Sequence, residues 1–141
     1  MACAAELVAL VYRQMMKDGP STQTGPIASR TPRRVYWVVG FDYTVTRIAE
    51  KYAWRYLPDS AKQSMAQGKE AAWLSSERRM WLPGDVEIAF RTGEDPLRLV
   101  GVSLDGLWLT EGAKLKRAVW EQVSPTLVER GGWLIAETAP F

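Results

Sequence analysis

The chain has 141 residues, of which 47% are hydrophobic and 24% are charged, and these values are typical of one globular domain with a buried core. Its formal net charge of +2 is too small to indicate nucleic acid binding by itself. One cysteine, Cys3, and no histidine exclude an internal disulfide, and they exclude a zinc site or a Ser-His triad within this chain. Any catalysis must therefore rest on carboxylates, Lys, Arg and hydroxyls.

The sequence carries no signal for a membrane. No apolar run approaches the roughly 18 residues that a membrane-spanning helix needs. The apolar stretch 2–12 contains Glu6 and follows no basic segment, so it is a poor signal peptide. With a single cysteine, these features predict a protein of the cytoplasm.

The first half of the chain predicts a helix, a loop, a strand and a second helix. Residues 2–17 repeat apolar positions at helical spacing, and the Gly and Pro after them end that helix. The loop 19–33 leads into Val35–Val39, an apolar run expected in a parallel sheet that is buried on both faces. Asp42 can cap a helix over 43–57. Its expected inner face consists of Val45, Ile48, Ala49, Tyr52, Ala53 and Tyr56.

The second half predicts a hairpin and two further strands with helices between them. Segment 58–72 is ambiguous and could hold a short helix. Pro83-Gly84-Asp85 is a tight-turn sequence, and the alternation along Val86–Phe90 predicts one buried face. The remaining expected elements are a strand at 104–109, a helix at 114–122, a short helix that restarts at Ser124-Pro125 and a strand at 133–136.

This alternation of apolar strands and helices predicts an α/β fold with helices on the faces of a mostly parallel sheet. Four tryptophans lie in predicted elements, and we expect core packing for all of them: Trp37, Trp108, Trp133 and Trp120. A basic run at 30–34 precedes the first strand. It is typical of a solvated loop, and the alternative is a contact to a phosphate backbone.

Polar residues follow two of the apolar strands. Glu111 comes after 107–109, and Thr138 comes after 134–136. In open α/β sheets, ligands bind beyond the carboxyl ends of the strands, so adjacent strands would place both residues near one edge. A carboxylate there can orient water for attack on a phosphoryl group, and a hydroxyl can hold Mg²⁺ or its waters. Taken alone, the Thr-Glu strand end is a weak signal, because many strands end this way for solubility.

The ordered series of motifs resembles the ATPase domain of large terminase subunits, the motors that pump DNA into phage capsids. The resemblance covers about residues 34–141. It rests on an acidic residue before an apolar strand, a Thr-Glu strand end with small residues after it, a Trp-bearing helix, Gly-Trp leading into a strand, and Thr-Ala-Pro at the end. Those segments are 34–42, 82–90, 101–113, 119–121, 124–127, 129–135 and 138–140.

The resemblance implies a partial P-loop NTPase-like layered domain over 1–141. It implies that Glu111 is the catalytic glutamate, that Thr110 occupies the metal-associated position and that Thr138 couples hydrolysis to movement. For the intact parent it implies ATP and Mg²⁺ as cofactors. It implies double-stranded DNA, the portal protein and the small terminase subunit as partners, and possible homo-oligomers.

The sequence departs from this pattern in several places. It contains no G-x-x-x-x-G-K-[ST] loop, and Gly68-Lys69-Glu70 follows no strand. We therefore expect a chain that begins after the first strand and its phosphate-binding loop, and that ends before the nuclease domain. Thr110 replaces an acidic residue, which predicts weaker metal binding. Val100 stands where many members carry Arg.

An arginine finger supplied in trans would stabilise the charge on the γ-phosphate. The sequence does not choose among its candidates, which are Arg78, Arg79, Arg91 and Arg98. The leading functional hypothesis is an ATPase-core fragment of a packaging motor. ATP hydrolysis is then coupled to DNA translocation in the intact protein, and the fragment alone is expected to be inactive because it lacks the phosphate-binding loop. The alternative hypothesis is a non-enzymatic remnant or interaction protein that keeps the α/β scaffold.

Overall fold

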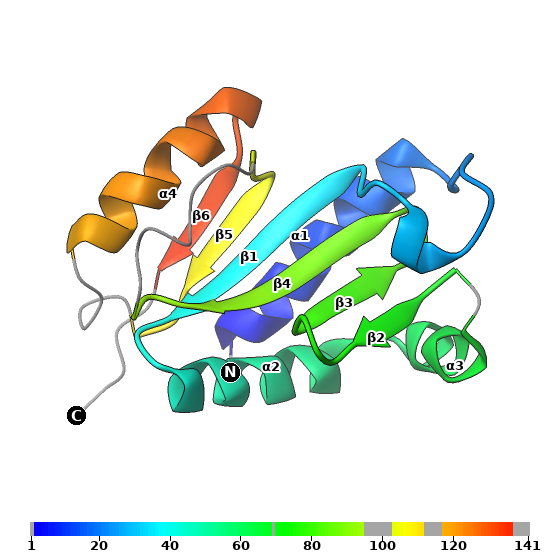
Figure 1. Cartoon of the computed structure of the whole chain (residues 1–141), viewed down its shortest axis with the longest axis horizontal. Coiled ribbons are helices and arrows are strands. Elements are labelled where there is room, and N and C mark those ends of the chain that lie inside the picture. Colours follow the sequence, from blue (N-terminus) through cyan, green and yellow to red (C-terminus); the bar gives the residue numbers. More distant parts are fainter. Residues whose placement is uncertain (1, 69, 95–102, 112–116, 137–141) are drawn as a thin grey trace.

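A computed structural model describes residues 2–68, 70–94, 103–111 and 117–136 of the chain. Helices and strands alternate over most of these ranges, with a hairpin in the middle (Figure 1). In chain order the elements are α1 (Ala2–Asp18), the 3₁₀ turn η1 (Ile27–Ser29), β1 (Arg34–Gly40), α2 (Tyr43–Tyr56), α3 (Asp59–Gln67), β2 (Ala72–Leu74), β3 (Arg79–Leu82), β4 (Val86–Thr92), β5 (Gly106–Leu109), α4 (Arg117–Arg130) and β6 (Trp133–Ala136).

The strands form one sheet in the order β2-β3-β4-β1-β5-β6. The strands β4, β1, β5 and β6 run parallel to one another. At one side of the sheet, β3 pairs antiparallel with β4, and β2 pairs antiparallel with β3. The predicted mostly parallel α/β fold is therefore confirmed. Strand β2 was not predicted, because its three residues carry too short a pattern to be distinguished from a loop.

Strand β1 lies inside the sheet and is buried on both faces, as its apolar run predicts. Residues Val35–Val39 are at most 5% exposed. Tyr36 and Val38 belong to the larger apolar cluster, whereas Trp37 and Val39 belong to a second cluster on the opposite face. A strand between two apolar layers needs no polar face, so its sequence shows no alternation.

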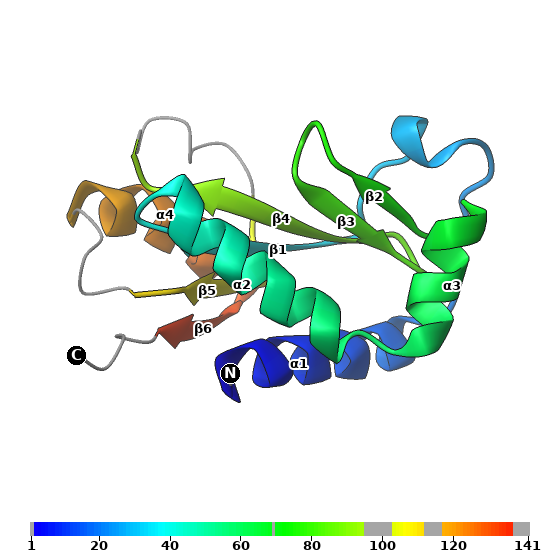
Figure 2. The same ribbon diagram turned by 90° about the horizontal axis from the view of Figure 1, so that it is seen from below.

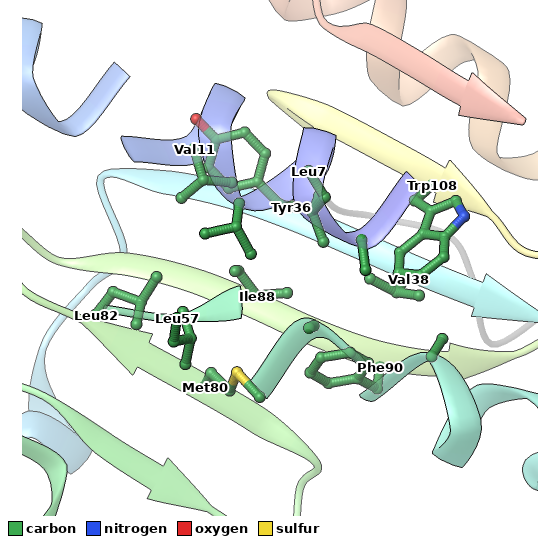
Figure 3. Packing of buried hydrophobic residues seen from close by; sticks show 14 of the residues in the cluster. Leu7, Val11, Tyr36, Val38, Leu57, Met80, Leu82, Ile88, Phe90 and Trp108 are labelled. Carbon is green, nitrogen blue, oxygen red and sulfur yellow. The ribbon is translucent and has the colours of Figure 1, made fainter. Parts of the chain in front are cut away.

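Helices cover both faces of the sheet. Side chains of α1 and α2 pack into the larger cluster with β1, β3 and β4 (Figure 3). Figure 1 shows α1 passing behind β1 and β4, and Figure 2 shows α2 beside α1. Val119, Val123 and Leu127 of α4 pack into the second cluster. This three-layer arrangement buries the apolar stripe of each helix against the sheet.

Helix α1 runs antiparallel to β1. Its last residue, Asp18, pairs with Arg34 at the start of β1, with Oδ2 2.9 Å from Nε. Seventeen helical residues span about 25 Å, and seven strand residues span about 23 Å. The amino end of α1 therefore lies toward the edge of the sheet at which β1 ends, as Figure 1 also shows.

The buried face of α2 differs from the prediction. Asp42 caps the helix as expected, because its carboxylate accepts a hydrogen bond from the backbone N–H of Val45 at 2.9 Å. However, Ile48 is 49% exposed and Tyr56 is 41% exposed. The buried residues are Thr46, Ala49 and Ala53. Such small side chains allow the helix to approach the sheet closely, whereas Ile48 and Tyr56 face solvent.

Helix α4 is continuous, although two helices were predicted. It spans Arg117–Arg130 with Pro125 inside, and residues 114–116 of the first predicted helix lie outside the described ranges. Pro125 removes one helical N–H. The apolar contacts of Val123 and Leu127 on the sheet hold the helix through that position. The predicted core role of Trp120 is wrong, because its side chain is 43% exposed.

The hairpin strand β4 is buried on both faces, whereas one buried face was predicted. Val86, Ile88 and Phe90 join the larger cluster. On the other face Ala89 joins the second cluster, and Glu87 forms an ion pair with Arg79. Because the ion pair neutralises Glu87, a charged residue can occupy a position that is only 6% exposed.

Candidate nucleotide-facing edge

The four parallel strands end at one edge of the sheet. The register places Arg91 of β4, Val39 of β1, Leu109 of β5 and Ala136 of β6 in one row. Thr110 and Glu111 follow Leu109 directly. The predicted adjacency of the two strands that precede Glu111 and Thr138 is therefore confirmed. Thr138 itself lies outside the described residues.

Thr110 and Glu111 form the turn at the end of β5. The backbone N–H of Thr110 donates to the carbonyl of Val39 at 3.0 Å, which extends the ladder between β5 and β1 by one residue. Thr110 is 3% exposed, and Glu111 is half-buried. Glu111 has a φ of +51°, in the left-handed region that costs a residue with a Cβ about 1–2 kcal/mol. Residues held in such a conformation cluster at functional sites.

The turn after β1 is closely packed against the start of α2. A Cβ added to Gly40 would lie 2.5 Å from Oγ1 of Thr46, so only glycine fits there. The Thr46 hydroxyl lies 2.9 Å from the Asp42 carbonyl oxygen and 3.0 Å from the Arg91 carbonyl oxygen. The side chains of Asp42 and Thr46 thus fix the loop between β1 and α2 beside the end of β4.

The structure separates the arginine candidates. Arg78 pairs with Glu50, and its guanidinium lies over the rings of Tyr43 and Trp73. Arg79 pairs with Glu77 and Glu87. These contacts hold both residues within their own chain.

Arg91 is the arginine in the strand-end row. Its Cζ lies 5.3 Å from the centre of the Trp37 ring, and its Nε is buried without a hydrogen-bond partner among the described residues. Arg98 lies outside the described residues. Arg91 therefore lies at the carboxyl edge, and within the part of the chain that the structure describes its Nε, like that of Arg79, has no hydrogen-bond partner.

Few metal donors are present among the described residues of this edge. Glu111 offers a carboxylate, and Thr110 offers a hydroxyl that lies largely inside the protein. Mg²⁺ commonly keeps several waters and binds through one or two carboxylates together with the phosphates of its substrate. Within the described ranges, no group of three or more His, Cys, Asp or Glu side chains could hold a metal ion by itself.

Asp105 organises the opposite edge of the sheet, and we did not single it out from the sequence as a binding residue. Its carboxylate accepts hydrogen bonds from Arg34 at 2.9 Å, Arg130 at 2.9 Å and the backbone N–H of Val35 at 3.0 Å. It is 7% exposed. It therefore ties β5, β1 and α4 together at the amino ends of the strands, far from Glu111 along β5.

The basic run 30–34 is bound within the protein. Arg30 pairs with Glu70 and Asp85, and Arg34 pairs with Asp18 and Asp105. The guanidinium of Arg33 donates to the backbone carbonyls of Asp18 and Pro20. The run 30–34 therefore has a structural role, which neither of the two interpretations of the sequence, a solvated loop or a phosphate contact, predicted.

Buried Asp85 anchors the loop after α1. Its carboxylate accepts hydrogen bonds from Ser21, Gln23, Arg30 and Trp81. Burial raises the pKa of the Asp85 carboxyl, but these hydrogen bonds more than offset that effect, so its pKa lies below the ordinary value. The loop 19–33 is thereby fastened to the hairpin turn.

The fold is a layered α/β sheet, and in open parallel sheets of this kind ligands bind at the carboxyl edge of the strands. Searches with the sequence matched no family model and no curated protein. Solved structures do match. Two are structures of the large terminase ATPase domain of Thermus phage P74-26, one of them a mutant. Each aligns with a TM-score of 0.64 at 22% identity, over 78% of this chain and 49% of the other.

A third match is the large terminase of the thermophilic bacteriophage D6E. It aligns with a TM-score of 0.59 at 12% identity, over 94% of this chain and 30% of that one. The chain therefore has the fold of a phage large-terminase ATPase domain, and it spans at most about half the length of these structures.

None of the helices in the described ranges has the length and apolar character of a membrane span.

Proposed function

We propose that this chain is the part of a phage terminase ATPase motor that carries the catalytic carboxylate. In the intact motor, ATP hydrolysis would drive double-stranded DNA into a capsid, with the portal protein and the small terminase subunit as partners. The observation that carries this proposal is Glu111, held in a left-handed conformation at the tip of an interior parallel strand. The likeness of the fold to terminase ATPase domains supports it.

The role proposed for each residue is the one that the resemblance to terminase ATPase domains implies. The Glu111 carboxylate would accept a proton from water and orient it toward the γ-phosphate. Thr110 would contribute its hydroxyl near Mg²⁺, which supplies charge neutralisation when it is bound with the nucleotide. Thr138, two residues beyond β6, would couple the state of the phosphate to movement of that strand.

Two further features favour an anion at this edge. The amino end of α1 lies toward it, and the positive end of a helix dipole attracts phosphate. Arg91 carries its charge in the same strand row as Leu109. We propose Arg91 as the sensor or finger among the described arginines, because Arg78 and Arg79 are already paired with carboxylates.

The test is a titration of the isotopically labelled chain with Mg-ATP, followed by NMR. Because this sequence lacks the lysine and glycine cradle of a phosphate-binding loop, we expect a dissociation constant on the order of 1 mM, or about 4 kcal/mol of binding free energy. Backbone signals of Gly40, Glu111 and the first turn of α1 should shift together. No shift at 10 times that concentration, or shifts confined to other surfaces, would refute the proposal.

Two site variants and one control variant test the same proposal in the Mg-ATP titration. Glu111→Gln and Thr138→Ala should each alter the response at the carboxyl edge, whereas Glu121→Gln, an exposed change on α4, should not. The second candidate function is a non-enzymatic interaction protein. A chain that shows no binding of Mg-ATP but binds motor components would establish it.

A further inference from the structure

A groove of about 550 Å³ lies along the outer side of α2, against β2 and β3. Tyr43, Ile48 and Trp54 of α2 contribute to it, and Trp73 and Met80 face it from the strands. Tyr43, Ile48 and Trp54 are 45%, 49% and 40% exposed. Three large apolar side chains exposed on one helix, beside a hollow, indicate a binding surface.

Basic side chains of α2 lie beside this groove. Helix α2 carries Arg47, Lys51 and Arg55 against one acidic residue, Glu50. The net charge of α2 is therefore +2. Glu50 is neutralised by Arg78, whereas Arg47 and Lys51 line the groove as exposed cations. The complementary occupant is therefore apolar and acidic.

The contacts of the aromatic rings favour a protein over a nucleic acid. Arg47 and Arg78 lie 5.6 and 5.3 Å from the centre of the Tyr43 ring. Lys62 lies 5.7 Å from the centre of the Trp54 ring. Cations thus already occupy ring faces on which single-stranded bases would stack. A duplex backbone offers no apolar group that could pack against Ile48 and Met80 in the groove.

We propose that this groove, lined by Tyr43, Arg47, Ile48, Lys51, Trp54 and Trp73, docks an acidic segment of a partner protein through an apolar anchor. Tyr, Trp, Met and Arg are the residues enriched at the centres of protein interfaces. An amphipathic helix or turn would place a large apolar side chain against Ile48 and Met80, and carboxylates beside Arg47 and Lys51. The inference does not rest on the proposed nucleotide site.

The experiment selects 16-residue peptides from a random displayed library on the folded chain, and it then measures synthetic copies by fluorescence anisotropy. We expect selected peptides to combine large apolar residues with Asp or Glu and to bind in the micromolar range. The double change Arg47→Glu with Lys51→Glu should weaken binding by about tenfold or more at moderate salt, because attraction becomes repulsion. Ile48→Ser should weaken it through loss of the apolar contact.

A matched control is available on α1. Arg13 and Lys17 are exposed and have the same four-residue spacing as Arg47 and Lys51. Arg13→Glu with Lys17→Glu changes net charge equally and should leave peptide binding unaltered. Glu111→Gln should also leave it unaltered, which separates this proposal from the nucleotide site. Circular dichroism and thermal unfolding confirm that each variant is folded.

Three outcomes would overturn the inference. Selection could yield no peptides, or peptides without acidic residues. Selected peptides could bind the Arg47→Glu, Lys51→Glu variant as tightly as the unchanged chain. A 20-residue oligothymidine or a 20-base-pair duplex could bind instead and lose its affinity on the same variants, which would assign the groove to nucleic acid.

Discussion

The backbone conformation of Glu111 leads to a quantitative prediction. Its φ of +51° is strained for any residue with a Cβ, by about 1–2 kcal/mol. Glycine removes that strain, but it loses more conformational freedom on folding, by about 0.5–1 kcal/mol. We therefore expect the unfolding free energy of Glu111→Gly to exceed that of Glu111→Ala by about 0.5–1 kcal/mol. Both variants lack the carboxylate, so their difference isolates the backbone.

Thermal and urea unfolding measure this difference. For a domain of this size, 1 kcal/mol corresponds to about 3 °C in Tm, so the glycine variant should melt about 2–3 °C above the alanine variant. Gly and Ala at exposed Arg13 of α1 provide the control, where the order should reverse because Gly is the poorer helix residue. An alanine variant as stable as the glycine variant, or more so, would show that position 111 is not held in the left-handed region.

Three further predictions concern the buried polar groups. Asp105→Ala removes the buried carboxylate that Arg34, Arg130 and the backbone N–H of Val35 share. Because both guanidinium groups reach solvent and Arg34 keeps its pair with Asp18, the change should lower the unfolding free energy by about 1–3 kcal/mol in urea titrations; a loss below about 0.5 kcal/mol would refute the anchoring role. The pKa of Asp85 is lowered in the folded state, so its stabilisation is present above pH ~4 and is lost as the pH falls through the folded-state pKa. Asp85→Asn should accordingly be less stable at pH 7 and lose less of its stability between pH 5 and pH 2, and an unchanged acid profile would contradict this. Burial raises the pKa of Tyr36 to about 12, so its contribution is complete below pH ~10 and is lost between pH 10 and 12. Tyr36→Phe should flatten the alkaline limb of the stability curve, and an identical limb in both proteins would contradict the burial argument.

The sequence by itself determined the elements whose causes are local. The apolar run at 35–39, the cap at Asp42 and the turn at Pro83-Gly84 each carry their own physical signal within a few residues. The order of strands and helices then restricts the topology to a layered, mostly parallel sheet. For the same reason the carboxyl edge near Glu111 could be located, because parallel strands end together.

Only the tertiary structure decided which faces are covered and which charges are paired. Periodicity predicted Ile48 inside, but small Ala49 and Ala53 let α2 approach the sheet with Ile48 turned outward. The partners of Asp105 come from α4 and β1, 25 and 71 residues away. Helix α4 passes through Pro125 because contacts with the sheet outweigh the missing hydrogen bond. Such contacts join residues distant in the chain, and no local pattern specifies them.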